Sequence, residues 1–439
     1  MASARRPGTG TNQEAVRRHN LGTVLAHLHH DGELSRAELT SRMGLNRSTI
    51  GALVGELVEL GAVVEATPGE RHGGRRPAGR PSLDVRPSSD SVYVIAVDVG
   101  VKVLQVARIG LGGEVLQRAS GRTPVSHSPA AVATAVVRLI RQIVASAPAD
   151  GALLGIGLGV PGVVRERDGV VRFAPNLGWH DVPFAQLLRE RMSHSVPLLV
   201  GNDADLGVLA EHTRGAGVGF DNLVFLMGDV GLGGGVIVDA HPLQGIGGYA
   251  GELGHLIVNT RGRVCRCGST GCWETEVCLP AIARALRVDD TELDRVMDRL
   301  EQVDRPSAAL REVGRYLGIG LGSVVNVLNP EVIVLGGIFR ALFPVIQDQA
   351  LQALTDAALE APREQVHVVV PMLGGDAVLI GAAEKAFEEL LADPARALSD
   401  VCRDAVAATA APENRSRARD GLVGQGSAPG DQARASVPA

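Results

Sequence analysis

The chain has 439 residues, an apolar fraction of 45% and a formal net charge of −6. A chain of this length predicts roughly two or three domains with buried cores. Aromatic residues make up only 3% of the sequence, which disfavours a base-stacking surface for single-stranded nucleic acid. The negative net charge argues against a protein coated with phosphate-binding groups, although a local patch can still be basic.

The cysteine pattern and the apolar runs indicate in which cellular compartment the protein is located. There are five cysteines, three of them close together beside a histidine, which favours metal ligands in a reducing environment over a disulfide framework. The first residues are polar and arginine-rich, unlike a secretory signal. Every long apolar run is interrupted by charge or glycine before it could span a bilayer. We expect a cytoplasmic protein without membrane insertion.

A helix-turn-helix is predicted after a polar, disordered tail at residues 1–12. Ser35 and Glu38 form a capping box that opens one helix, which ends near Gly44. Asn46 caps a second helix, which ends at Gly61 before a short strand at 62–65. Its apolar residues follow helical spacing and predict one buried face: Ile50, Leu53, Val54, Leu57 and Val58.

The next segment, residues 67–90, is rich in glycine, proline and arginine and predicts a basic wing followed by a linker. We therefore expect a winged helix-turn-helix domain over residues 13–88 that binds a double-stranded DNA operator. The first turn of the second helix would meet base edges, and wing arginines would contact phosphates or the minor groove. The predicted contacts are Asn46, Arg47, Ser48, Thr49, Arg75, Arg76 and Arg80. The alternative is a helical hairpin used for dimerisation.

From residue 91 the pattern becomes α/β, because apolar strands that end in glycine-rich turns alternate with helices. Doubly wound sheets are expected. The predicted strands are 92–97, 155–159, 198–200, 223–226, 235–238, 332–335 and 366–370. The predicted helices are 128–145, 183–192, 205–213, 276–286, 306–327, 340–357 and 376–391. The composition of residues 394–439 predicts a disordered tail.

The most informative segment runs from His255 to Cys272 and has the spacing H-x9-C-x-C-x4-C. Thiolates and imidazoles are the ligands that Zn²⁺ prefers, and four of them complete a closed, structural site. We predict one structural zinc held by His255, Cys265, Cys267 and Cys272. Free thiols are the alternative. Cys278 is expected to be buried and Cys402 to be an exposed tail thiol.

Several motifs together resemble the ROK family, which groups sugar kinases with sugar-responsive repressors. They are Leu158–Gly162, Pro175–Trp179, Gly201–Asp205, Gly251–His255, the cysteine loop through Glu274, and Asn329–Gly337. The resemblance covers nearly all of residues 15–390, and Gly79–Ser82 together with the helix-turn-helix resembles the xylose and N-acetylglucosamine repressor branch. It implies an N-terminal all-α winged helix-turn-helix followed by a two-lobed, actin/hexokinase-like α/β domain. The small lobe would comprise residues 91–199 plus 376–393, and the large lobe residues 200–375 with the zinc loop.

The same resemblance implies a sugar site between the lobes. Its residues would be Asn202, Asp203, Glu252, His255 and Glu274, with Asn176 and Gly162 nearby. Carboxylates suit this purpose because they accept hydrogen bonds from ring hydroxyls. His255 would bind zinc through one ring nitrogen and a sugar hydroxyl through the other. The alternative is a zinc loop without a role in sugar binding.

The two turns that hold ATP phosphates in the family's kinases are altered here. The first reads Asp98-Val99-Gly100-Val101-Lys102 where the kinases have Asp-x-Gly-Gly-Thr. The second begins at Asp229 and has Val230 in place of a hydroxyl residue. Gly201 replaces an acidic residue, and Asp205 replaces an asparagine.

These departures predict that the protein is not an enzyme, although Asp203 would be the base if it were a kinase. We expect a sugar-responsive regulator, most simply a repressor of carbohydrate uptake or catabolism genes, that acts as a homodimer or homotetramer. An ATP-dependent, glucokinase-like sugar kinase with an added DNA-binding head is the alternative. A third hypothesis has a transport-system protein as the partner that releases the DNA.

Overall fold

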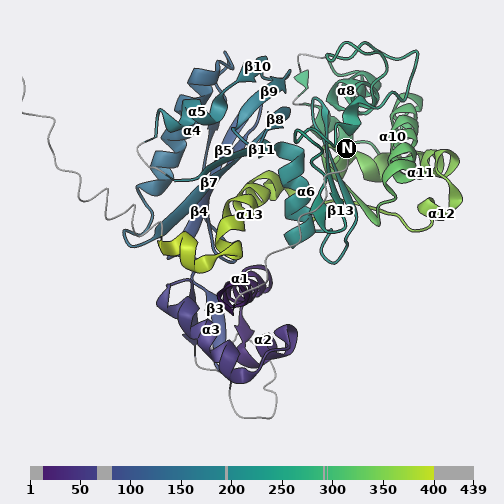
Figure 1. Ribbon diagram of the computed structural model, residues 1–439. Coiled ribbons are helices and arrows are strands. Elements are labelled where there is room, and N and C mark those ends of the chain that lie inside the picture. The colour runs from purple at the N-terminus through teal and green to yellow at the C-terminus, as the bar shows by residue number, and fades with distance from the viewer. Residues whose placement is uncertain (1–12, 67–81, 193–195, 290–291, 294, 400–439) are drawn as a thin grey trace, which may run out of the picture.

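The computed structural model describes residues 13–66, 82–192, 196–289, 292–293 and 295–399 (Figure 1). The expected N-terminal tail, most of the basic wing and most of the C-terminal tail lie outside these residues, as do Arg75, Arg76, Arg80 and Cys402. We call residues 13–87 the head and residues 92–399 the body.

The head is a small helical unit with a three-stranded sheet. It contains α1 Gln13–Asp31, α2 Arg36–Met43 and α3 Arg47–Glu59, with β1 Leu34–Ser35, β2 Val63–Ala66 and β3 Asp84–Pro87 in the order β1-β3-β2. The capping box of Ser35 and Glu38 is present, and Gly44 ends α2 in the left-handed conformation with φ 64°. Asn46 caps α3 by accepting a hydrogen bond from the backbone of Thr49. The expected pair of helices joined by a short turn is present, and β2 and β3 flank the segment where the wing is expected.

The buried face of α3 differs from the expectation at one position. Ile50, Leu53, Val54 and Leu57 are buried, whereas Val58 is 40% exposed. Residues three or four positions apart lie on the same face of a helix, and Ile50, Val54 and Leu57 follow this spacing towards the core. Val58 lies at the edge of that face.

The first sheet of the body has five strands in the order β11-β7-β4-β5-β6. They are β4 Val92–Val99, β5 Val103–Gly110, β6 Val115–Arg122, β7 Ala152–Val160 and β11 Leu198–Asn202. Helices α4 Pro129–Val144 and α5 Phe184–Arg189 cover one face, and α13 Ala377–Ala392 covers the other (Figure 1). A smaller sheet follows β7 and consists of β8 Val163–Arg165, β9 Val170–Ala174 and β10 Trp179–Val182.

The second sheet has the order β14-β13-β12-β15-β16. Its strands are β12 Leu223–Gly228, β13 Leu232–Val238, β14 His241–Pro242, β15 Val332–Gly337 and β16 His367–Val369. One face carries α7 Trp273–Val277, α8 Leu279–Leu286, α9 Arg295–Glu301, α10 Ala308–Leu328 and α11 Phe339–Ala357. The short helix α12 Glu360–Arg363 contacts α10 and α11. The other face packs against α6 Asp203–Arg214, which lies between the two sheets (Figure 1).

Both sheets are mixed, because β5 runs antiparallel to its neighbours β4 and β6, and β13 runs antiparallel to β12. Two sequence expectations need correction. The single helix expected over 276–286 is instead two helices, α7 and α8, separated by Cys278, whose backbone is extended. Pro280 is in the first turn of α8, where a proline is tolerated, whereas it would disrupt the interior of one continuous helix. Residues 394–399 are helical instead of part of a disordered tail, because Leu398 is buried against α13 and the head.

The expected division into lobes stays a prediction, and β11 runs across its boundary at residue 199. Among the described residues, no helix combines the length and apolar character needed to cross a bilayer.

Candidate functional site

The cysteine loop folds into a cluster that can hold a metal ion. One ligand atom from each of His255, Cys265, Cys267 and Cys272 lies within 4.8 Å of all the others. The Nδ1 atom of His255 is 3.7 Å from Sγ of Cys265, and the Sγ atoms of Cys267 and Cys272 are 3.6 Å apart. Tetrahedral zinc bound at about 2.0–2.3 Å separates its ligand atoms by roughly 3.5–3.8 Å, so both distances suit that ion.

The loop is attached to the core on its C-terminal side. Short antiparallel bridges join Ile257 to Cys272 and Val264 to Thr270. The next residue, Trp273, begins α7 and is fully buried beneath α10. Cys278 is also fully buried, as expected. The ligand cluster is therefore connected to the second sheet through α7.

Two glutamates lie beside the cluster. The Nε2 atom of His255, the nitrogen that faces away from the thiols, is 3.9 Å from Oε2 of Glu252. Glu274 accepts a hydrogen bond from the Cys265 thiol at 2.9 Å and from the backbone of Leu232 at 3.3 Å. Burial raises the pKa of Glu252, with Glu274 adding to the effect and His255 opposing it. One nitrogen of His255 thus faces the thiols and the other faces Glu252, while their roles in binding metal and ligand stay a prediction.

The other half of the expected site is at the N-terminus of α6. Asn202 accepts hydrogen bonds from the backbones of Ala204 and Asp205 at 2.8 and 3.0 Å and donates to the carbonyl oxygen of Gly162 at 2.8 Å. Gly162 has φ 109°, and a side chain there would meet the carbonyl oxygen of Phe173. The Asn202 amide thus holds strand β11, helix α6 and the turn after β7 together, and its second N–H remains to be offered to a ligand.

A pocket joins the two halves. Its lining includes Asn202 and Asp205 from α6 and its cap, Val164 from β8, Gly234 from β13 and Glu252. From the sequence motifs, Asp205 was noted only as a departure from the kinase pattern and was not assigned to the sugar site. Burial raises its pKa to about 8, and the nearby charges of Glu166, Asp203 and Glu252 add to the shift.

Asn176 is brought towards the metal loop from the opposite side of the cleft. It follows β9, and its side-chain oxygen accepts a hydrogen bond from Arg266 between two of the cysteine ligands. An ideal Cβ at Gly231 would lie 3.6 Å from the Asn176 amide and 2.9 Å from Glu274. The structure therefore collects Asn176, Glu274 and the metal loop in one place, as expected for the site.

Three carboxylates, those of Asp98, Asp203 and Asp229, lie near one another beside the first turn of α6. Burial raises the pKa of Asp98 and that of Asp203 to about 7 each. Repulsion from Asp229 adds to the shift of Asp98, and repulsion from Asp98 and Asp229 adds to the shift of Asp203. Burial also raises the pKa of Asp229, and Lys102 opposes that shift. Val101 forms its turn without a positive φ, so the glycine that the kinase pattern has there is not needed by this backbone.

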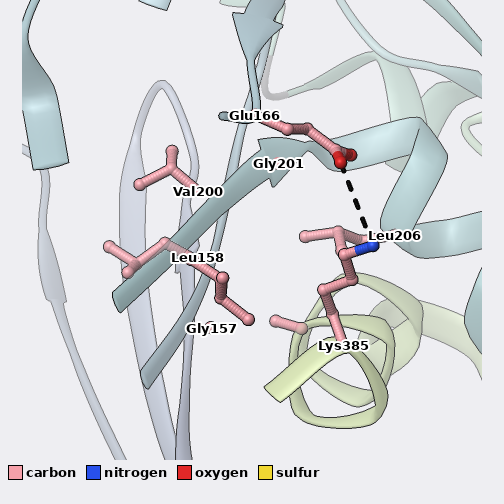
Figure 2. A pocket seen from close by; sticks show the side chains of 9 residues that line it. Gly157, Leu158, Glu166, Val200, Gly201, Leu206 and Lys385 are labelled. Carbon is pink, nitrogen blue, oxygen red and sulfur yellow. Dashed lines mark ion pairs between the residues drawn. The ribbon is translucent and has the colours of Figure 1, made fainter. Parts of the chain in front are cut away.

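Glu166 contacts both the loop after β14 and helix α13. It follows β8, accepts a hydrogen bond from Gln244 of the second-sheet loop at 3.1 Å, and pairs with Lys385 of α13 at 3.9 Å. Figure 2 shows the Glu166 and Lys385 side chains approaching each other above Leu206, at a cavity floored by Gly157 and Leu158. Residues 166, 244 and 385 belong to no recognised motif, so no sequence pattern predicts this contact.

The first turn of α3 is exposed at the surface of the head. Oδ1 of Asn46 accepts hydrogen bonds from the hydroxyls of Ser48 and Thr49 at 2.7 and 2.9 Å. Asn46, Arg47 and Ser48 are exposed and Thr49 is half-buried. The expected DNA contacts that the structure describes thus share one surface, with Arg47 as its charged group.

Comparison with known proteins follows the same division into head and body. A protein-family model described as the ROK family matches residues 94–388. The chain belongs to the ROK family. A xylose repressor from Caldicellulosiruptor bescii is 28% identical over 379 residues, which cover 82% of this chain and 93% of that protein. A glucokinase from Halalkalibacterium halodurans is 30% identical over 313 residues, which cover 67% of this chain and 94% of that protein.

A solved ROK structure matches the head and the body together. It is the crystal structure of a ROK family transcriptional regulator, a homolog of the E. coli MLC protein, with a TM-score of 0.70 and 24% identity. The match covers 90% of this chain and 100% of that one. The resemblance inferred from the motifs and the fold class it implied are confirmed.

Proposed function

We propose that this ROK protein is a sugar-responsive DNA-binding regulator, most simply a repressor of carbohydrate genes. The proposal is carried by the observation that the same chain has an exposed helix-turn-helix in its head and a pocket lined by Asn202, Asp205 and Glu252 in its body. A xylose repressor matches more of this chain than a glucokinase does, which supports a role for the head. As a dimer or tetramer in the cytoplasm, it would place paired heads on a symmetric operator.

Zinc would have a structural role in this site. Three thiolates and one imidazole form a complete ligand set, with separations that suit tetrahedral Zn²⁺. A bound zinc would fix the ring of His255, so that its Nε2 atom and Glu252 present a stable donor and acceptor pair. Glu252, His255, Glu274, Asn176, Asn202 and Asp203 would bind the sugar hydroxyls. The zinc itself would take no part in chemistry.

Sugar kinase activity is the second candidate, and Asp203 is the observation that favours it. Its pKa of about 7 suits a general base near neutral pH. However, Asp98 and Asp229 surround it with negative charge where a nucleotide's phosphates would have to lie. Because positioned phosphate contacts supply most of phosphoryl-transfer catalysis, we propose that sugar binding survives here without transfer.

Operator binding tests the proposal directly. The full chain is titrated onto DNA from upstream of its own gene, at fixed salt, with and without xylose, glucose or N-acetylglucosamine. The proposal expects a specific footprint that one sugar weakens. A chain that gives no footprint at moderate salt, or one that ignores every sugar, contradicts it.

A coupled ADP-release assay over the same sugars separates the kinase. The proposal expects no turnover above the Asp203→Asn variant. Turnover that Asp203→Asn abolishes would favour the kinase instead. Release of DNA that needs a transport-system protein and no sugar would favour the third hypothesis.

A further inference from the structure

The head and the body meet at a buried cluster of charged and polar side chains, which we call the head junction. It contains His29 and His30 from the last turn of α1, Glu384 from α13, Arg214 from the end of α6, and Gly112 between β5 and β6. His29 is fully buried and Glu384 is 4% exposed. The family's sugar, zinc and phosphate motifs do not include these residues.

Glu384 is the centre of the junction. It accepts hydrogen bonds at its two oxygens from Nε2 of His29 at 3.1–3.3 Å, from Nε2 of His30 at 3.3 Å and from Nε of Arg214 at 2.5 Å. Burial alone would raise the pKa of Glu384, but the bonds from the two histidines and the charge of Arg214 hold it well below its usual value. The carboxylate is therefore ionised and fully paired.

Two histidines and a carboxylate also form a possible metal triad, since their ligand atoms lie within 4.8 Å of one another. The backbone N–H of Gly112 excludes this for His29, because it donates to Nδ1 at 2.9 Å. A neutral imidazole has one lone-pair nitrogen, so Nε2 must carry the proton and donate to Glu384. Burial also lowers the pKa of His29, which keeps the ring neutral. The cluster is a hydrogen-bonded joint and not a metal site.

Arg214 adds a direct contact from the body to the backbone of the head. Besides its bond to Glu384, it donates to the carbonyl oxygen of His29 at 3.0 Å and to that of Gly112 at 3.0 Å. Its side chain is 14% exposed. One planar guanidinium thus joins α6, α13, the β5–β6 turn and the end of α1, a geometry that a lysine ammonium cannot reproduce.

The opposite end of the same helix is in the sugar site. Helix α6 is capped by Asn202 and runs for 12 residues from Asp203 to Arg214. It is closely packed, because a side chain at Gly381 of α13 would meet the carbonyl oxygen of Leu206. A helix of this length spans about 17 Å and moves as a unit, so a shift at its first turn reaches its last. Figure 1 shows α6 between the two sheets, with α13 next to it and α1 below.

From this geometry we propose that Arg214 is the positioning residue that transmits sugar occupancy from the first turn of α6 to the DNA-binding head. This inference rests on the proposed function. Sugar binding at Asn202 and Asp203 moves or tilts α6. Arg214 then changes its contact with the His29 carbonyl, and the angle between head and body changes. The paired heads of a dimer lose the spacing that the operator requires.

Arg214→Gln tests the inference in the full-length protein with the sugar found active above. Sugar affinity is measured by calorimetry, and operator affinity by anisotropy with and without sugar. The coupling is the ratio of operator affinity without sugar to operator affinity with sugar, and in allosteric proteins such a ratio is typically about 5–150-fold. In the variant we expect this ratio to fall below about twofold, while the affinity for the sugar stays within about twofold of the wild-type value. Arg214→Lys, which keeps the charge but not the fork, should give an intermediate ratio.

Arg118→Gln is the matched control. Arg118 also forms a two-bond pair with a carboxylate on α13's N-terminal side, Asp376, at 2.6 and 2.8 Å, but it does not touch the head. It should keep the full sugar response.

Four results overturn the inference: a full response in Arg214→Gln, equal losses in Arg214→Gln and Arg118→Gln, loss of sugar affinity together with the response, or a second zinc per chain that His29→Gln removes. If Arg214→Gln does not fold, Glu384→Gln, which keeps the shape of the junction, is measured in the same way. A wild-type chain that binds operator but ignores sugar overturns the proposed function itself.

Discussion

The head junction and the cleft are both clusters of buried charge, but their charges are arranged in opposite ways. In the junction Glu384 is surrounded by Arg214, His29 and His30, and its pKa is lowered. In the cleft Asp98 and Asp203 face each other, and their pKa values are raised to about 7. Buried charge is tolerated when it is paired and hydrogen-bonded, and it is costly when like charges meet.

The difference teaches which region is complete without a ligand. The junction satisfies its own donors and acceptors, so it can hold the head on the body at all times. The cleft's carboxylates are acceptors in excess of the donors around them, and the sugar of the proposed function would supply the missing donors. Four predictions test this comparison, from the largest expected effect to the smallest.

Glu384→Ala should destabilise the protein most. It leaves the guanidinium of Arg214 and the N–H of His29 buried without their acceptor, which costs about 3–5 kcal/mol of unfolding free energy. Urea unfolding followed by circular dichroism measures the change. Asp376→Ala removes the exposed partner of Arg118 and should cost no more than about 1 kcal/mol. Equal costs for the two variants would show that the junction is not special.

Removing the metal cluster should damage the cleft and leave the junction intact. Cys265→Ser, or chelation, frees His255 from its fixed orientation, and sugar affinity should fall about 10–100-fold. The matched control is Cys278→Ser, a buried cysteine outside the cluster, which should keep its zinc content. Calorimetry and metal analysis measure the two effects. Unchanged sugar affinity in a zinc-free protein would separate the metal from the sugar site.

Asp205→Asn should stabilise the protein in a pH-dependent way. The folded pKa of Asp205, about 8, is above its unfolded value near 3.9, so its stabilising contribution is present below pH 4 and is lost as the pH rises to 8. The variant does not titrate, so its advantage should be almost nothing at pH 4, grow steadily above that pH and be largest at pH 8. Denaturant melts at several pH values measure it. An advantage that does not change with pH would mean that the charge is not the cause.

His29 should produce the opposite and smallest trend. Its folded pKa is below the unfolded value of 6.5, so its contribution is present above pH 6.5 and is lost as the pH falls. His29→Gln, whose amide can still donate to Glu384, should flatten the decline in stability between pH 7.5 and 5.5 by about 1 kcal/mol. Melts at pH 7.5 and 5.5 measure the slope. An unchanged slope would assign the decline to other groups.

Local patterns predicted the parts of the molecule that are local in the chain. The capping box of Ser35 and Glu38 and the cluster from His255 to Cys272 depend on residues a few positions apart, and both formed as expected. Pro280 carried the signal for the break between α7 and α8, but the apolar run around it favoured one helix. The β5–β6 hairpin was missed because its outer strand, β6, contains several polar and charged residues and does not form an apolar run.

The head junction could not be predicted from the sequence. His29 and Glu384 are 355 residues apart, and Arg214 and Glu384 are 170 apart. No spacing rule joins such residues, and each one alone looks like an ordinary polar residue on a helix. The pairing exists only because α1, α6 and α13 meet in the fold.

Leu398 shows that the first and last described parts of the chain share one core. It is buried with Leu21 and Leu25 of α1, although the ribosome makes α1 nearly four hundred residues earlier. During synthesis the head therefore waits, without its docking surface, until α13 and residues 394–399 have been made. If the proposed function holds, a chain acquires sugar-controlled operator binding only after Leu398 has been translated.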